Sequence, residues 1–277
     1  MKYKKSKWKQ ADLLKRNHVT AKALPETLFY NIQNLKDMLK RHPFVYIKPD
    51  TGGQGRGIFR VTRKLTKEYH IQGNHYSQMC TDVNSVHQCL EILIQAQNYI
   101  IQQGIQSETS DGRPFDFRVH VQRVRGRWVI GGIVGRLGSP SNIVTNRHQG
   151  GRPLRIKQLF RKYLAWNRKK EKRVIERIKR LAMETAKAMN KGYPECLEQG
   201  VDIGVDAKGR PWIFESNITP GIAVFAALKD KKAYWKIRKN RRLQRKDKEI
   251  AMSRYMFTFF LYVSSSCWLL DLVDRFF

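Results

Sequence analysis

The chain has 277 residues, of which 41% are hydrophobic, and it carries a formal net charge of +31 at pH 7. This apolar content can build the core of one large domain or two moderate ones, which excludes a largely disordered protein. The charge is far higher than solubility requires. We therefore expect a polyanion or an anionic surface among the partners, and RNA, DNA, acidic polymers and anionic lipid all qualify.

The cysteines and the N-terminus indicate a cellular setting. Cys80, Cys89, Cys196 and Cys267 have neither paired metal-ligand spacing nor the density of a disulfide framework. A reducing, cytoplasmic location is the expectation. Residues 1–10 are basic and polar residues follow them, so no signal peptide is predicted.

The first predicted element follows a lysine-rich arm that contains Trp8. Residues 27–39 have apolar side chains at helical spacing, which predicts a packing helix, and residues 24–27, Leu-Pro-Glu-Thr, are typical of a helix start. The apolar positions are Leu28, Ile32, Leu35 and Leu39.

Residues 44–62 predict a strand, a glycine-rich turn and a second strand. The apolar run at 44–47 ends in Lys48, and Pro49 interrupts the regular ladder. Four glycines within the turn allow positive φ angles and close approach to an anion, so a phosphate-binding loop is predicted. The alternative is a mobile hairpin tip at the surface. The glycines are Gly52, Gly53, Gly55 and Gly57.

The middle of the chain predicts further alternating elements. Residues 68–79 predict a hairpin around Gly73 and Asn74, residues 82–95 a helix, and residues 99–102 a buried strand. Residues 115–124 and 127–134 predict an antiparallel pair. The first strand of this pair has one polar face, for which period alone favours exposure to solvent. That face carries Asp116, Arg118 and His120.

Two elements and a loop complete the predicted fold. Residues 138–151 form a long polar loop that carries Asn146 and His148 and is expected to be either functional or disordered. Residues 168–190 predict an amphipathic helix. Residues 201–205 and 212–214 predict a hairpin.

This last hairpin carries a candidate metal site. Asp202 lies in its first strand, and Glu215 and Asn217, two residues apart, share one side at the end of the second. Two carboxylates and an amide are hard oxygen donors suited to Mg²⁺ or Mn²⁺. The alternative is a hairpin edge protected by charge.

The last fifty residues have a different composition. Residues 229–248 are strongly basic and contain Tyr234 and Trp235, which is typical of a flexible or helical arm attracted to polyanions. Residues 256–270 carry no charge but are short for a bilayer span, so docking on the core or on a membrane surface is expected.

The order of these motifs closely resembles the ATP-grasp superfamily. The phrases KPDTGGQGRGIFRV, FDFRVHVQ and DIGVDAKGRPWIFESNITPG are similar to the YheC/YheD family, whose members are associated with the endospore coat. The resemblance covers about residues 12–228 and is specific, because five separated motifs occur in the family's order.

The resemblance implies an α+β ATP-grasp fold, in which two α+β subdomains clasp ATP between antiparallel sheets. Residues 42–228 would form the ATP-grasp domain. Residues 1–41 would be a basic arm and helix in place of a larger substrate-facing region, and residues 229–277 a basic arm with an apolar tail. The acceptor site would then be reduced or supplied by another protein.

The resemblance also implies a role for each motif. Lys48 would contact the nucleotide phosphates, Arg118 would neutralise phosphate charge, and Asn146 would lie near the triphosphate, which makes these three the candidate catalytic residues. The metal ligands would be Asp202, Glu215 and Asn217. The ATP-binding set would be Lys48, Gly52, Gly53, Gln54, Gly55, Gly57, Gln102, Gln103, Gly104, Asp116 and Asn146, with the backbone of 102–104 receiving the adenine and Asp116 near the ribose.

One departure affects the activity that the resemblance implies. Related ligases often place an arginine two residues before the loop asparagine, and here Val144 stands there, leaving Arg136 or Arg147 as substitutes. Three functions follow as alternatives: an ATP- and Mg²⁺-dependent carboxylate–amine ligase, an ATP-binding structural protein of the spore coat with little turnover, and a nucleic-acid-binding protein.

Overall fold

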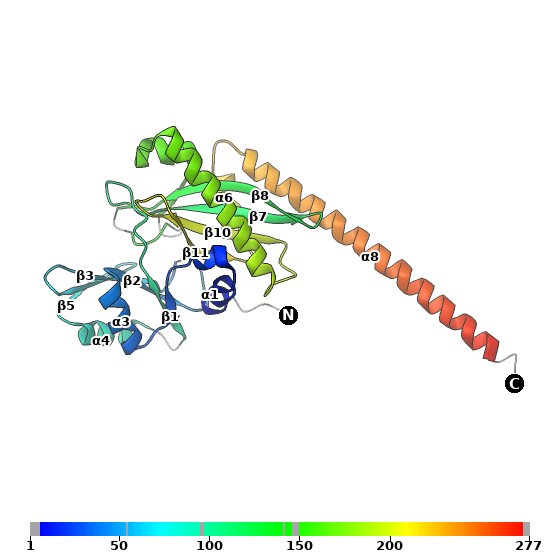
Figure 1. Ribbon diagram of the computed structural model, residues 1–277, viewed down its shortest axis with the longest axis horizontal. Helices are drawn as coiled ribbons and strands as arrows, with labels where there is room; N and C mark the ends of the chain where they lie inside the picture. Colours follow the sequence, from blue (N-terminus) through cyan, green and yellow to red (C-terminus); the bar gives the residue numbers. More distant parts are fainter. Residues whose placement is uncertain (1–5, 54, 95–96, 141, 146–149, 274–277) are drawn as a thin grey trace.

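The computed structural model describes residues 6–53, 55–94, 97–140, 142–145 and 150–273, which form two lobes and a long helix that extends away from them (Figure 1). Each lobe is an antiparallel sheet covered by helices, so the architecture is α+β.

The first lobe is a six-stranded sheet with two helices. Its strand order is β1-β6-β2-β3-β4-β5, and α3 (Ile32–Arg41) and α4 (Val83–Leu93) pack against it. Apolar side chains from both helices and from the sheet are fully buried together, among them Leu35, Leu90 and Ile47. The strands are β1 (Thr27–Phe29), β2 (Phe44–Pro49), β3 (Phe59–Arg63), β4 (Tyr69–Gly73), β5 (Tyr76–Cys80) and β6 (Tyr99–Gln103).

The second lobe is a five-stranded sheet of order β11-β10-β7-β8-β9. Helix α6 (Arg168–Asn190) packs against one face through side chains such as Val174 and Ile178, which supply much of the core. The strands are β7 (Phe115–Val124), β8 (Arg127–Leu137), β9 (Arg152–Leu154), β10 (Glu198–Val205) and β11 (Pro211–Asn217).

The N-terminal residues join this second lobe. Helices α1 (Lys7–Lys15) and α2 (His18–Ala21) pack on α6, and Leu14 and Ala23 are buried in the same core. The start of α1 is nevertheless bonded to the first lobe. Asp50, which follows β2, accepts hydrogen bonds from Ser6 Oγ at 3.0 Å and Trp8 N at 2.8 Å. Helix α1 therefore links the two lobes.

Short helical segments and a long helix complete the second lobe. Helix α5 (Ile156–Gln158) continues into a π-helical turn, η2 (Leu159–Leu164), and α7 (Ala223–Ala226) precedes α8 (Lys232–Val273). The first half of α8 packs on β7 and β8, with Ile237 buried, and its remainder leads away from the body (Figure 1). Polar contacts fix its position: Asn240 Nδ2 donates to Gln122 Oε1 at 2.9 Å, and Arg241 pairs with Glu198 at 2.8 Å. In the described part of the chain, no helix combines the length and apolar character needed to cross a bilayer.

The helix expected over residues 27–39 is only partly correct. Thr27, Leu28 and Phe29 form strand β1, which pairs with Gln102, Ile101 and Ile100 of β6. The helix begins later because Asn31 acts as its N-cap, its side chain accepting a hydrogen bond from Asn34 N at 2.7 Å.

The expectation that the polar face of β7 is solvated is wrong. Asp116 and His120 are 3% and 0% exposed, and Arg118 is largely buried. The polar side chains lie between the sheet and the segments that cover it, where Asp116 and Arg118 form ion pairs with β8 and β10, and His120 Nε2 lies 3.3 Å from a carboxylate oxygen of Glu198. Asp116 and Arg118 can be buried as charged groups because each has an oppositely charged hydrogen-bonding partner, whereas burial lowers the pKa of His120.

Candidate functional site

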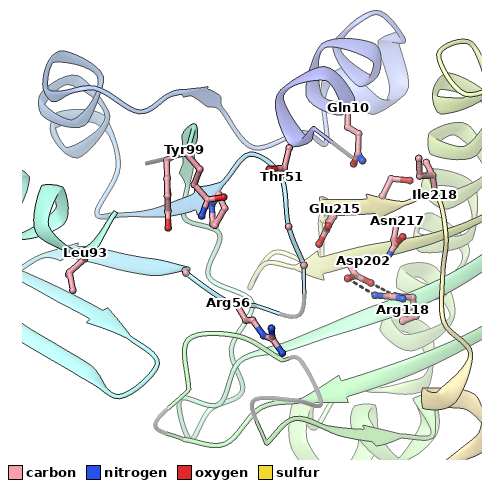
Figure 2. A pocket seen from close by; sticks show the side chains of 16 residues that line it. Gln10, Thr51, Arg56, Leu93, Tyr99, Arg118, Asp202, Glu215, Asn217 and Ile218 are labelled. Atoms are coloured by element: carbon pink, nitrogen blue, oxygen red, sulfur yellow. Dashed lines mark hydrogen bonds and ion pairs between the residues drawn. The ribbon is translucent and has the colours of Figure 1, made fainter. Parts of the chain in front are cut away.

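A cavity of about 860 Å³ lies between the lobes (Figure 2). One wall is the loop after β2, with Thr51 and Arg56, and the opposite wall is the β10–β11 hairpin, with Asp202 and Glu215. Gln10 of α1 also lines it. The glycine-rich turn and the acidic hairpin, which are about 150 residues apart in the sequence, therefore face the same space.

Lys48 is the penultimate residue of β2, and its side chain lines a smaller hollow beside the cavity, which Asp202 and Glu215 also line. Its Nζ donates to Gln102 Oε1 at 2.7 Å, and Gln102 Nε2 in turn donates to Thr27 Oγ1 at 3.0 Å. Burial lowers the pKa of Lys48 to about 8, with Lys7 lowering it further and Glu215 and Asp202 opposing the shift. Within the described residues Lys48 forms no salt bridge, so its charge has only a neutral acceptor.

Lys7, which was not among the site residues expected from the sequence, is a second cation at this place. It is the first residue of α1, and its Nζ donates to the carbonyl oxygen of Pro49 at 2.7 Å. It lines the same hollow as Lys48 and Glu215. Burial lowers its pKa, while Glu215 and Asp50 oppose the shift. The missed signal is Ser6, a good N-cap that places the next residue at a helix start beside the Lys48 strand.

Asp202 is the centre of a buried charge network. Its carboxylate accepts hydrogen bonds from Arg118 Nε and from Arg118 Nη2, the latter at 2.9 Å, and it pairs with Arg136 Nη2 at 2.9 Å. Arg136 also donates to Asp116, which accepts a further bond from Thr145 Oγ1 at 2.6 Å. Burial alone would raise the pKa of Asp202, but the two arginines more than offset this and lower it.

Glu215 and Asn217 project from β11 toward the cavity (Figure 2). Asp202 and Glu215 are direct cross-strand partners in the β10–β11 ladder, as the predicted hairpin requires. Among the described residues no side chain or backbone group donates a hydrogen bond to the Glu215 carboxylate. Asn217 Oδ1 accepts a bond from Thr219 N at 2.9 Å. Glu215 is therefore the carboxylate available to a ligand.

These donors fit a hard divalent cation through Glu215 and the amide of Asn217. Asp202 has lone pairs left on its carboxylate, although two arginines already occupy part of its capacity. Across the described ranges, no group of three His, Cys, Asp or Glu side chains is placed to hold a metal. A metal at this site would therefore be coordinated by the carboxylates of Glu215 and Asp202 and by the amide oxygen of Asn217.

The glycine turn has the backbone geometry that its sequence predicts. Gly52, Gly55 and Gly57 have φ values of 132°, 76° and 66°. A Cβ at Gly57 would lie 2.9 Å from Tyr99 Oη and 3.1 Å from Pro49 Cγ, so the turn has room only for glycine there. Gly52, Gly53 and Gly57 line the cavity, and Arg56 adds an exposed cation.

An apolar hollow adjoins Lys48. Tyr46, Ile58, Ile105 and Phe214 contribute to its walls, together with Gln102, Gln103 and Asp116. Phe214 precedes Glu215 and would normally point to the opposite face, but a β-bulge between Asp202 and Ile203 leaves it opposite no residue. Both side chains can then face the hollow. No pattern in the sequence signals this bulge, so Phe214 was missed.

Some of the expected site residues use their binding groups within the fold, and others fall outside the described residues. Gly104 does not line the hollow, and its N–H donates to Phe44 O at 3.0 Å. The side-chain oxygen of Gln103 accepts a bond from Glu26 N at 3.1 Å. Gln54, Asn146 and Arg147 lie outside the described residues. Arg136 forms salt bridges with Asp116 and Asp202.

A family model described as YheC/D like ATP-grasp matches residues 2–242. The chain belongs to this family. Two curated Bacillus subtilis (strain 168) proteins are similar to it. The endospore coat-associated protein YheD is 28% identical over 80% of this chain and 49% of its own length, and the endospore coat-associated protein YheC is 22% identical over 78% and 60%. The chain thus spans only about half to three fifths of these relatives.

The solved structures support the fold. The crystal structure of the D-cycloserine synthetase DcsG matches with a TM-score of 0.53 and 13% sequence identity, covering 86% of this chain and 70% of that one. This likeness shows an α+β ATP-grasp fold with antiparallel sheets, as the sequence predicted.

Proposed function

We propose that this YheC/D like ATP-grasp protein is an ATP- and Mg²⁺-dependent ligase that joins a carboxylate to an amine. The observation that carries the proposal is the convergence at one hollow of two lysine ammonium groups with only neutral acceptors, Lys48 from β2 and Lys7 from α1, and two carboxylates of the β10–β11 hairpin. Paired buried cations of this kind are stabilised by an anion, and a triphosphate supplies the required charge.

The residues of the site divide between binding and charge neutralisation. Lys7 and Lys48 would donate to phosphate oxygens, the glycine turn would cover them, and the hollow lined by Tyr46 and Phe214 would take the planar base. Arg118, held in place by Asp202, would face the phosphoryl group as negative charge moves onto the acceptor oxygen. Glu215 and Asn217, with Asp202, would hold Mg²⁺, which when bound neutralises phosphate charge.

The proposed reaction has two steps. A substrate carboxylate oxygen attacks the γ-phosphorus of ATP, the bond to the β-phosphate oxygen breaks, and ADP leaves. An amine then attacks the carbonyl carbon of the acyl phosphate and expels inorganic phosphate, with loss of one proton from the nitrogen. The products are an amide, ADP and phosphate.

The names of the relatives suggest a location and a partner. We propose that the protein acts in association with the spore coat, because both curated relatives are named as endospore coat-associated. The basic and apolar residues 229–277 would contact a polyanion or an anionic membrane surface. Removal of residues 249–277, which leaves the packed half of α8 in place, should weaken that contact and leave ATP binding intact.

The test is a search for carboxylate-dependent ADP formation. Purified protein is incubated with ATP, Mg²⁺ and pooled amino acids or cell-wall precursors, and ADP release is followed together with the mass of new products. ADP and a condensed product that both require the acid and the amine would support the ligase. Tight ATP binding without turnover in any pool would favour a structural nucleotide-binding protein instead.

ATP affinity is expected to decline as the pH rises above about 8, the pKa to which burial lowers Lys48. Phosphate binds the protonated form of Lys48. The contribution of Lys48 to ATP affinity is therefore complete below this pKa, and above it the affinity falls by up to about tenfold per pH unit. Calorimetric titration with ATP from pH 7 to pH 9 measures this dependence of ATP affinity on pH. A Lys48→Arg variant keeps its charge over this range and should show a flatter profile, with Lys7 as the remaining buried lysine. A wild-type profile equally flat would contradict the assignment.

Replacement of Lys7 by methionine is expected to weaken ATP binding by about tenfold to a hundredfold, because a charge-assisted hydrogen bond to phosphate is lost. The thermal midpoint should stay unchanged or rise, since a partly buried cation with a lowered pKa is removed. Lys9→Met, in the same helix but exposed, is the matched control and should bind ATP normally. Equal effects of the two substitutions would rule out a specific role for Lys7.

A further inference from the structure

A basic groove lies on the second lobe between α5–η2 and the segment before α8. It has a volume of about 660 Å³. Its lining combines an apolar part, Pro153, Ala227 and Leu228, with cationic side chains and contains no acidic residue. The cations are Arg155, Lys157, Arg161, Lys162 and Lys229.

The charges of this groove are largely uncompensated. All five cationic residues are exposed. Within the described part of the chain only Arg161 has an acidic partner, Glu171, at the long distance of 3.9 Å. Concentrating like charges without partners costs free energy, and an anionic ligand removes that cost. Exposed pairs elsewhere, such as Arg16 with Asp12, have the compensation that the groove cations lack.

The spacing of the cations matches an extended chain. Lys157 and Arg161 are four residues apart on the helical run of α5 and η2, which places side chains on one side about 6 Å apart. Alternate residues of an extended peptide point to one side at intervals of about 7 Å. The apolar part of the groove suits the methylene groups of glutamate side chains.

The lining favours a peptide over a nucleic acid. Single-stranded nucleic acids usually stack their bases on aromatic side chains, and no aromatic residue lines the groove. The nearby Tyr163 is already in contact with Arg113, Arg152 and Lys162, whose cationic groups lie 5.0, 5.6 and 5.9 Å from its ring centroid.

From these observations we propose that the groove between α5–η2 and the start of α8 binds an acidic, glutamate-rich peptide segment in extended form. The groove is next to the candidate ATP site, since Pro153 on the edge strand β9 is the cross-strand partner of Arg136. Binding requires no ligase chemistry, so it can be tested separately from the proposed reaction.

The experiment measures anisotropy of a fluorescent oligoglutamate peptide with the full chain. The groove variant is Lys157→Gln/Arg161→Gln/Lys162→Gln, and the control variant Lys22→Gln/Lys64→Gln/Lys208→Gln removes the same charge from exposed positions outside the groove. We expect the groove variant to bind about tenfold more weakly and the control to bind like the wild type, because several ion pairs are lost only in the first. Circular dichroism confirms folding. Lys157→Gln/Lys229→Gln takes one cation from each side of the groove and provides a second variant, expected to weaken binding as well.

Two results would overturn the proposal. Equal loss in the groove and control variants would show that binding follows net charge alone. Tighter binding of a single-stranded oligonucleotide of equal formal charge, lost in the same groove variant, would assign the groove to nucleic acid. ATP binding, measured on every variant, should stay at the wild-type level and so reports independently on the candidate ATP site.

Discussion

Replacement of Glu215 by glutamine is expected to abolish the gain in ATP affinity that Mg²⁺ provides and to lower turnover by about a hundredfold. Glu215 lines the cavity from β11, beside Asn217 and opposite Asp202, and no described group donates to its carboxylate. Its charge acts on both Lys7 and Lys48, since it raises the pKa of each. Glutamine preserves the shape and removes the charge that a divalent cation requires.

The measurement for Glu215 is a pair of calorimetric ATP titrations, with Mg²⁺ and with a chelator. Wild-type protein should bind more tightly with the metal, and the variant should bind equally in both. Glu176→Gln, an exposed carboxylate on α6 that pairs with Lys179, is the matched control and should retain the metal dependence. A Glu215→Gln protein that keeps the full dependence would remove Glu215 from the metal site.

Replacement of Asp202 by alanine is expected to destabilise the fold by about 3–5 kcal/mol, because a buried pair loses one partner. Arg118 is left without its acidic partner, and Arg136 keeps only Asp116. For a chain of this size the loss corresponds to a fall in the thermal midpoint of about 6–20 °C. The effect separates the structural role of Asp202 from its proposed part in metal binding.

The control for Asp202 is Asp12→Ala, which breaks an exposed pair with Arg16 on α1 and should change stability by no more than about 0.5 kcal/mol. Denaturant unfolding in the absence of nucleotide and metal gives both values. If the two variants had equal stability, the buried network would contribute nothing to the fold.

The predictable parts of the site are those encoded locally. The apolar run at residues 44–47 and the glycines after it predicted the β2–β3 hairpin, and the two-residue spacing of Glu215 and Asn217 predicted a shared side. The prediction that these two turns face each other across a cavity came from the family resemblance, because neither stretch of sequence contains information about the position of the other.

The features that the sequence did not predict depend on contacts between distant residues or on the backbone. Thr27 joins a strand because β6, about 75 residues later, offers it a partner. The alternating sequence of β7 separates a polar face from an apolar face, but it does not indicate which segments pack on the polar face. The burial of Asp116 and His120 was therefore not predictable. Phe214 reaches the hollow through a bulge, a backbone irregularity that leaves no mark in residue type.

The attachment of α1 to Asp50 limits how the molecule can open. Helix α1 packs in the core of the second lobe, whereas Asp50 follows β2 of the first, and the bonds from Ser6 and Trp8 cross between them. A hinge motion that separates β2 from β10 must therefore break these bonds and withdraw the Lys7 ammonium from the strand end at Pro49. Release of a product from the cavity and separation of the first turn of α1 from Asp50 would then occur together.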